Sequence, residues 1–284
     1  MKKLALISLF VTGLFFQFNL MYAQKNDTLF TYVKGGYFNR GSNSGDADEK
    51  PVRKIKINDF FIGKYEVTNA EYCVFLNYLK PDAGLQRKYI NIKGHYKEIK
   101  CRIYKKDSVY YTEQGYKNLP VIFVSWFGAD AYCKFVGGRL LTEAEWEYAA
   151  KGGNISFLSK LFQNYLYSGS NKPGIVSWYR DNSENKPHRV GRKKANKANT
   201  FDMSGNAEEW CNDWYSPEYY SVSPADNPQG IETGRMKVHR GGSWYNTPEM
   251  LRITNRRASK PVTQNALIGF RIVKDVTGFS VKKN

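Results

Sequence analysis

The chain has 284 residues, with 43 Lys and Arg against 26 Asp and Glu, which gives a formal net charge of +17. Hydrophobic residues make up 42% and aromatic residues 15% of the sequence, which excludes a disordered chain and indicates a globular body. The 24 Gly and 10 Pro favour many turns and short strands over a helical bundle.

The N-terminus has the pattern of a secretory signal peptide. Two lysines precede an apolar stretch over residues 4–16, and cleavage is expected after Ala23. A retained anchor is the alternative, but the stretch is shorter than the roughly 20 apolar residues that span a bilayer. A lipoprotein would carry a cysteine here, and the first is Cys73. We therefore expect a signal peptide over residues 1–23 and a periplasmic or secreted domain over residues 24–284, without a transmembrane segment after cleavage.

The first elements of the mature chain are predicted to be two strands and a helix. Residues 31–38 alternate around a Gly-Gly pair like one bent strand, and residues 52–60 alternate apolar and polar side chains like a half-buried strand. Thr68 and Glu71 form a capping box before an apolar run, which predicts a helix from there.

Residues 87–106 combine basic and aromatic side chains. Such a pattern can bind nucleic acid or an anionic glycan. A charge-rich hairpin with a solvated face explains it equally, and an exported protein seldom meets nucleic acid, so no nucleic-acid partner is expected. The residues concerned are Arg87, Lys88, Tyr89, Lys93, Tyr96, Lys97, Lys100, Arg102, Tyr104, Lys105 and Lys106.

Two further helices are predicted, one over residues 127–136 and one from Thr142, where Glu145 completes a second capping box. Residues 154–280 show no long helical period and consist of loops and short strands. The chain is therefore expected to be one loop-rich α+β domain with few helices.

The cysteines leave two alternatives open. In an exported chain the four could form two disulfides with three possible connectivities. Alternatively, Cys73 and Cys133, which lie in apolar helical patterns, could be buried as small hydrophobic residues. No CxxC motif is present and the chain has 3 His, which excludes thioredoxin chemistry and the usual zinc modules. The residues are Cys73, Cys101, Cys133 and Cys211.

Seven sequence blocks, in this order, resemble the formylglycine-generating enzyme family, also called the sulfatase-modifying factor domain. The resemblance covers roughly residues 30–274 and implies a variant of the C-type lectin fold. The blocks are GGYFNRGS (35–42), IGKYEVTN (62–69), residues 120–126, GGRLLTEAEWEYAA (137–150), DMSGNAEEW (202–210), RGGSW (240–244) and GFR (269–271).

The resemblance implies a copper site that this chain lacks. Oxidases of the family convert a cysteine of a sulfatase to formylglycine with molecular oxygen and a copper(I) ion held by two cysteines. The matching positions here are Asn246 and Leu251. Copper(I) is a soft ion that prefers thiolates, so neither copper nor the family's oxidase activity is expected. The family also usually has Trp, a wall of the substrate cleft, where this chain has Glu208.

The resemblance also implies a calcium site. Asp202, Gly205, Ala207 and Glu209 match a family loop in which two side-chain oxygens and two backbone carbonyls surround the ion. Hard oxygen ligands at this spacing suit calcium, which is expected here in a structural role. The alternative is that Glu209 pairs with an arginine and Asp202 caps a turn.

The segment over residues 241–257 borders the substrate groove in the family. Its aromatic and cationic side chains would suit a peptide or glycan. Alternatively, Trp244 is core and the arginines pair with Glu143, Glu145 or Glu209. The candidate cleft, with no confident catalytic residue, comprises Glu208, Trp244, Tyr245, Asn246 and Arg252.

Four functions are compatible with these features. The first is a non-catalytic binding or scaffold protein of the cell envelope, as in family members that serve gliding motility and type IX secretion. Its partner would be an envelope protein, a peptide or a glycan. The second is a divergent enzyme that uses the same cleft, with His239 as a further polar group. A formylglycine-generating oxidase is disfavoured by the missing cysteines, and a glycan-binding lectin rests on analogy of fold.

Overall fold

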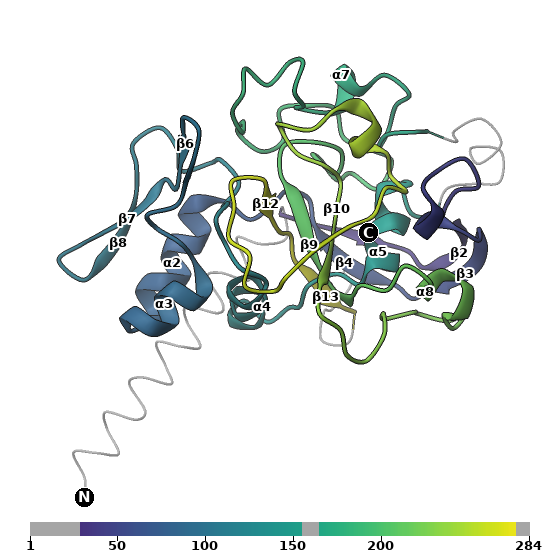
Figure 1. Ribbon diagram of the computed structural model, residues 1–284, viewed down its shortest axis with the longest axis horizontal. Helices are drawn as coiled ribbons and strands as arrows, with labels where there is room; N and C mark the ends of the chain where they lie inside the picture. Colours follow the sequence, from purple (N-terminus) through teal and green to yellow (C-terminus); the bar gives the residue numbers. More distant parts are fainter. Residues whose placement is uncertain (1–28, 155–164, 277–284) are drawn as a thin grey trace, which may run out of the picture.

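Short strands that lie far apart in the sequence pair to form two sheets (Figure 1). The computed structural model describes residues 29–154 and 165–276. One sheet has the strand order β1-β4-β13, which joins both ends of the described chain, and the other has the order β11-β10-β9-β12. These strands are β1 (Phe30–Val33), β4 (Phe60–Gly63), β9 (Glu208–Trp214), β10 (Lys237–Arg240), β11 (Arg257–Ser259), β12 (Ile268–Gly269) and β13 (Val273–Asp275).

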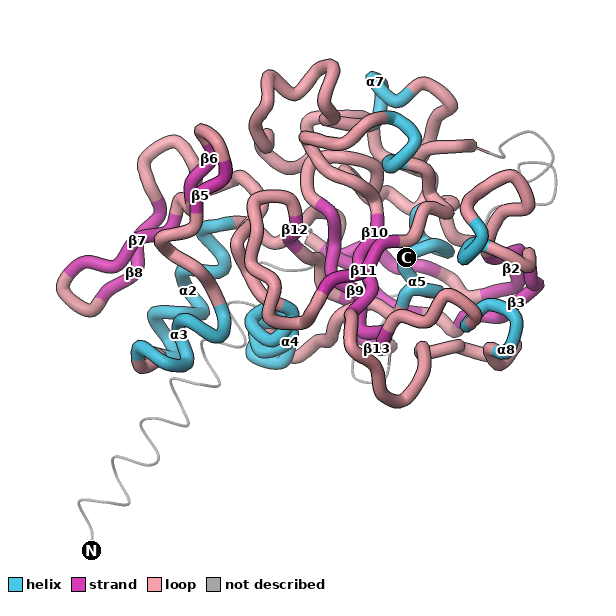
Figure 2. The backbone as a smooth tube through the Cα atoms, in the orientation of Figure 1, coloured by secondary structure: helices cyan, strands magenta, loops and turns pink. Residues whose placement is uncertain are grey.

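Three strand pairs and several short helices surround the sheets. Loops connect most of these elements, as Figure 2 shows, so the α+β class with few helices and long loops is confirmed. The paired strands are β2 (Gly36–Arg40) with β3 (Arg53–Ile57), β5 (His95–Tyr96) with β6 (Ile99–Lys100), and β7 (Ile103–Lys106) with β8 (Val109–Thr112). The helices are α2 (Asn69–Leu79), α3 (Ala83–Tyr89), α4 (Trp126–Phe135), α5 (Glu143–Ala150), α7 (Pro173–Val176), α8 (Tyr219–Val222) and the 3-10 turns η1 (Ala47–Glu49) and η2 (Pro248–Leu251).

Strands do form over both ranges predicted near the N-terminus, but the prediction of one continuous strand in each range is wrong. Each is divided between β1-β4-β13 and the β2–β3 pair, with the breaks at Gly35 and Asp59. Asp59 accepts a hydrogen bond from the Gly35 N–H at 2.8 Å and one from the Tyr32 hydroxyl. A Cβ on Gly35 would lie 2.3 Å from the Ile57 carbonyl oxygen, so the two breaks pack against each other.

The predicted helix starts are confirmed. Thr68 and Glu71 form a capping box at α2, and Thr142 and Glu145 form another at α5. The helix predicted over residues 127–136 is α4, for which Ser125 is the N-cap. Helix α3, at the start of the basic stretch, was not predicted.

The basic stretch forms the end of α3 and the strands β5, β6 and β7, beside α2 (Figure 1). The β7–β8 hairpin is held on α2 because Asn77 exchanges two hydrogen bonds with the backbone of Tyr110, at 2.8 and 2.7 Å. Every basic side chain of the stretch is exposed except Arg102, which is half-buried. This arrangement agrees with a solvated charged face.

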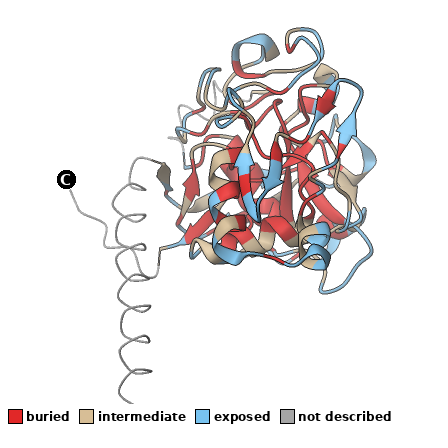
Figure 3. Ribbon diagram, turned by 90° about the vertical axis from the view of Figure 1, so that its left-hand side faces the viewer, coloured by how far each residue is buried: buried red, intermediate tan, exposed pale blue. Residues whose placement is uncertain are grey.

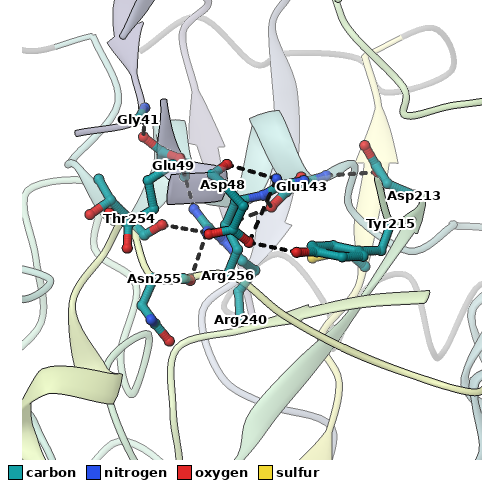
Figure 4. Close-up of polar contacts among 12 residues, drawn as sticks. Gly41, Asp48, Glu49, Glu143, Asp213, Tyr215, Arg240, Thr254, Asn255 and Arg256 are labelled. Atoms are coloured by element: carbon teal, nitrogen blue, oxygen red, sulfur yellow. Dashed lines mark hydrogen bonds and ion pairs between the residues drawn. The ribbon is translucent and has the colours of Figure 1, made fainter. Parts of the chain in front are cut away.

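Helix α5 lies in a charged part of the core, although all eight of its residues are buried (Figure 4). Arg256 Nε lies 2.7 Å from Glu143 Oε1, and Arg240 Nη2 lies 2.7 Å from Glu147 Oε2. Burial by itself would raise the pKa of Glu143, but the guanidinium groups of Arg256 and Arg240 hold it below its usual value. Removing one partner of such a buried pair typically costs about 3–5 kcal/mol, so these contacts fix how α5 packs.

Apolar side chains form two large clusters, one of which includes residues of α5. One gathers around α2, α4 and Trp210, and the other around β3, β4 and α5. In Figure 3 the buried residues fill the interior of the body, and exposed residues lie on its outer strands and loops.

The four cysteines are all buried and all are free thiols, so the disulfide alternative is wrong and the buried-hydrophobe alternative holds. Burial raises the pKa of Cys73 to about 12, which keeps this thiol protonated. The expected signal peptide lies outside the described residues. Within residues 29–154 and 165–276, every helix is too short or too polar to cross a membrane.

Candidate functional site

The loop that was predicted to bind calcium leads directly into β9. Asp202, Gly205 and Asn206 all have positive φ angles, of 59°, 88° and 64°. A Cβ on Gly205 would lie 2.3 Å from the Trp178 carbonyl oxygen, so only glycine allows the loop to approach the preceding segment. The residues of this block therefore have a role in backbone geometry, whether or not the loop binds an ion.

Glu209 is held by protein donors. Arg271 Nη2 donates to Oε1 at 2.5 Å and Arg271 Nε donates to Oε2 at 2.6 Å, while the Trp146 indole donates to Oε2 at 2.7 Å. Glu209 and Arg271 are both almost completely buried. This is the arginine pair that the sequence left as an alternative.

Asp202 keeps one oxygen without a hydrogen-bond partner among the described residues. Its Oδ2 accepts from the Gly191 N–H at 2.6 Å, while Oδ1 is buried and unpartnered. Burial raises the pKa of Asp202 to about 6, and burial together with the charges of Asp202 and Glu209 raises the pKa of Glu66 well above its usual value. Three buried carboxyl groups therefore surround one buried arginine, Arg271.

The unpartnered oxygen of Asp202 is compatible with a bound cation, whereas both oxygens of Glu209 already accept from Arg271 or Trp146. Within the part of the chain that the structure describes, no three His, Cys, Asp or Glu side chains are arranged to hold a metal ion. Calcium here would depend on Asp202 and on the carbonyls of Gly205 and Ala207. It stays a prediction.

The positions of the family's copper cysteines are occupied by well-packed side chains. Asn246 Oδ1 accepts from the backbone N–H and the hydroxyl of Ser243, at 2.8 and 2.7 Å. Leu251 is completely buried and packs with Tyr167 and Val176. Gly242 makes this possible, because a Cβ there would lie 2.6 Å from Leu251 Cδ2.

Only some of the candidate cleft residues lie together. Trp244 is completely buried in the apolar core, and its indole donates to the Ala266 carbonyl at 2.9 Å. Arg252 pairs with Glu49 at 2.8 Å. Tyr245 is half-buried, and the hydrogen bond that its hydroxyl receives from Lys97 at 2.5 Å lowers its pKa.

Glu208, the remaining residue of the candidate cleft, contacts a histidine and an arginine that lie outside the set of cleft residues named above. Its Oε2 lies 2.6 Å from His239 Nδ1, and its Oε1 lies 3.6 Å from Arg257 Nε. His239 Nε2 lies 3.0 Å from the Ser259 hydroxyl oxygen. Sequence reasoning had named Glu208 and His239 but missed Ser259, because no motif marks it and only strand pairing brings it to the histidine.

A cavity lies elsewhere on the molecule. A cavity of about 550 Å³ contains Glu66 and Gly191 in its wall and is bordered by Arg189 and Arg192. None of Glu208, Tyr245 or Asn246 lines it. The cavity therefore adjoins the Asp202 loop and not the candidate cleft.

Comparison with known proteins decides the family. A family model described as the sulfatase-modifying factor enzyme 1-like domain matches residues 18–276. The chain belongs to this family. The formylglycine-generating enzyme of Streptomyces coelicolor is 30% identical over 290 residues, which cover 86% of this chain and 88% of that protein.

Other relatives of this sulfatase-modifying factor domain are longer proteins. The serine/threonine-protein kinase pkn1 of Chlamydia caviae is 36% identical over 264 residues, which cover 89% of this chain and 39% of that protein. The chain thus spans about two fifths of the length of that relative.

Solved structures confirm the formylglycine-generating-enzyme-type fold. Treponema denticola variable protein 1 superimposes with a TM-score of 0.67 at 22% identity, covering 87% of this chain and 94% of that one. PvdO from Pseudomonas aeruginosa superimposes with a TM-score of 0.65 at 22% identity, with the same coverage. At this identity the likeness concerns the fold alone.

Proposed function

We propose that this sulfatase-modifying factor domain is an exported binding or scaffold protein of the cell envelope that does not carry out copper-dependent oxidation. The observation that carries the proposal is the state of the two copper positions. Asn246 is held by Ser243, and Leu251 is part of an apolar cluster. Neither can supply the thiolate that copper(I) requires.

The fold supports such a role without the oxidation chemistry. Tyr245 forms an edge contact with Tyr96 at a centroid distance of 5.7 Å, and Lys97 Nζ lies 4.4 Å from the centre of the Tyr245 ring. Aromatic faces beside a lysine can pack against a peptide or a sugar while the ammonium pairs with an acidic group. A partner bearing acidic groups would also suit the net charge, which is +15 once residues 1–23 with Lys2 and Lys3 are removed.

The absence of oxidation can be tested directly. The purified protein is incubated with copper(I), oxygen and a cysteine-containing sulfatase peptide, and the peptide is examined by mass spectrometry. The formylglycine-generating enzyme of Streptomyces coelicolor serves as the positive control. We expect no aldehyde product from this chain, and a peptide carrying the aldehyde would overturn the proposal.

Export needs its own experiment. The expected signal peptide over residues 1–23 predicts that cells contain a shortened protein outside the cytoplasm. Fractionation followed by N-terminal sequencing measures both location and cleavage. An intact precursor that stays in the cytoplasm would contradict the envelope role.

A divergent enzyme of the same fold is a second candidate, favoured by one observation. Glu208, His239 and Ser259 lie in contact in that order, and an acid, a histidine and a hydroxyl in this order can perform acyl transfer.

A further inference from the structure

Three neighbouring strands bring Glu208, His239 and Ser259 to one face of a sheet. The strand order is β11-β10-β9-β12, so β11 is an edge strand with β10 between it and β9. His239 pairs in register with Arg257 of β11 and with Trp210 of β9. Side chains two residues apart on a strand share a face, which places Ser259 with Arg257, and Glu208 with Trp210.

The contacts follow the strand order across this face. His239 Nδ1 lies 2.6 Å from Glu208 Oε2, and Nε2, on the other side of the ring, lies 3.0 Å from Ser259 Oγ. Glu208 and His239 are 1% and 2% exposed, while Ser259 is partly exposed at the sheet edge. The acid and the histidine are therefore shielded from solvent, whereas Ser259 is only partly buried.

The contact between the acid and the ring is close but not directed as a hydrogen bond. His239 Nδ1 and Glu208 Oε1 are both buried without a hydrogen-bond partner among the described residues. Such contacts are often poorly aligned in a ligand-free site and tighten when substrate binds. An unpartnered ring nitrogen facing a carboxylate is also unusual in a core whose only task is packing, because an unmade buried hydrogen bond costs stability.

We propose that Ser259 is the nucleophile of an acyl-transfer site, with His239 as its general base and Glu208 as the residue that orients the imidazole. The proposal goes beyond the binding function and develops the divergent-enzyme alternative. With the Nδ1 proton facing Glu208, Nε2 carries a lone pair toward the Ser259 hydroxyl. This is the arrangement that activates a serine for attack on a carbonyl carbon.

The reaction is the hydrolysis of an ester. Ser259 Oγ bonds to the ester carbonyl carbon while His239 Nε2 takes the hydroxyl proton. The bond from that carbon to the alkoxy oxygen then breaks, and His239 returns the proton to the leaving alcohol. Water next attacks the acyl carbon and gives a proton to His239 Nε2. The bond from that carbon to Ser259 Oγ then breaks and His239 returns the proton to Oγ, which releases the carboxylic acid and restores Ser259. One ester and one water yield one alcohol and one acid.

Arg257 indicates the class of ester. Its side chain is 37% exposed on the same face as Ser259, and it lies 3.6 Å from Glu208 Oε1. Arg257 Nη1 also lies 3.2 Å from Met250 Sδ, which contacts the Asn246 amide at 3.2 Å. The serine site therefore adjoins Asn246, which matches a copper ligand of the family, and the partly exposed guanidinium of Arg257 would pair with a carboxylate on the substrate. We infer an ester whose acyl group carries a negative charge.

Covalent labelling tests the nucleophile. The full chain is incubated with a fluorescent fluorophosphonate, and the labelled peptide is identified by mass spectrometry. We expect the label on Ser259, no labelling of Ser259→Ala, and a labelling rate at least ~100-fold lower for His239→Gln. Ser44→Ala is the matched control and should label like the wild type, because Ser44 is exposed and bonds only to Ser42 in the described chain.

Two further variants test the other roles. Glu208→Gln should slow labelling, and Glu208→Asp should restore part of the rate, which a packing role would not produce because Asp is the poorer fit in size. With 4-nitrophenyl hemisuccinate and 4-nitrophenyl acetate as substrates, Arg257→Ala should lower kcat/KM about 10-fold more for the anionic ester than for the neutral one, and an equal loss for both esters would refute the pairing of Arg257 with a substrate carboxylate.

The labelling and kinetic results can be told apart from loss of folding and from failure of the binding proposal. Thermal denaturation shows whether each variant folds, and comparisons are made among those that melt like the wild type. Absence of label on Ser259 in folded wild-type protein, or equal labelling of folded His239→Gln, refutes the nucleophile. Neither result bears on the copper experiment, so the lack of oxidase activity can hold while the serine site fails.

Discussion

Asp213 is a buried carboxyl group whose ionisation is expected to oppose folding at neutral pH. It is 2% exposed on β9, and its Oδ2 accepts from the Glu143 N–H at 2.8 Å, while Oδ1 has no hydrogen-bond partner among the described residues (Figure 4). Burial first, and then the charge of Glu143, raise the pKa of Asp213 from 3.8 to about 8. The folded protein therefore keeps a proton that the unfolded chain releases.

The sign of the effect follows from this difference. Below pH 3.8 the carboxyl group is protonated in both states, and between pH 3.8 and about 8 only the folded state binds the proton. The stability contributed by Asp213 is therefore lost as the pH rises through this window. At about 1.4 kcal/mol per pH unit, the loss reaches about 4 kcal/mol at pH 7.

Asp213→Asn removes this dependence while keeping the shape and the acceptor for the Glu143 N–H. We expect the variant to gain stability over the wild type by about 1.4 kcal/mol for each unit between pH 5 and pH 7. Urea denaturation followed by tryptophan fluorescence measures the difference at each pH. Asp226→Asn is the control, because the Asp226 side chain is 71% exposed and lies 3.8 Å from Lys56. A difference that does not change with pH would show that folded Asp213 is ionised.

The remaining predictions concern the metal loop and the candidate cleft. Calcium at a hundredfold excess over Kd should stabilise the folded protein by about 2.7 kcal/mol, and Asp202→Ala should abolish the resulting rise in melting temperature. A melting temperature that a chelator leaves unchanged would contradict calcium binding at Asp202. Arg252→Ala should cost about 3 kcal/mol or more in a urea titration, because it strands the buried charge of Glu49, and a loss below 1 kcal/mol would show that the pair contributes little. Tyr245→Ala should leave the melting temperature almost unchanged while weakening capture of an envelope partner in a pull-down. If this variant unfolds, Tyr245 stabilises the fold and the binding role assigned to it is refuted.

The sequence by itself determined the family, the two capping-box helix starts and the absence of cysteines at the positions that match the family's copper ligands. Capping boxes depend on residues three positions apart, so Thr68 with Glu71 could be recognised without knowledge of the tertiary fold. The ordered blocks were specific for the same reason, since each lies in one short segment. The absence of thiols at Asn246 and Leu251 needed only a count from Ser243.

Tertiary structure decided what depends on residues far apart in the chain. Residues 31–38 and 52–60 each have strand-like alternation. The contact between Gly35 and Asp59 interrupts both ranges and divides each between the β1-β4-β13 sheet and the β2–β3 pair. No local pattern contains this contact, because the two residues are far apart in the chain. The partner of Glu209 is Arg271, which is 62 residues away in the chain, so the local sequence block could not reveal this ion pair. Likewise, Ser259 meets His239 only because β10 and β11 pair, and strand pairing depends on the register of whole elements rather than on the residues beside the serine.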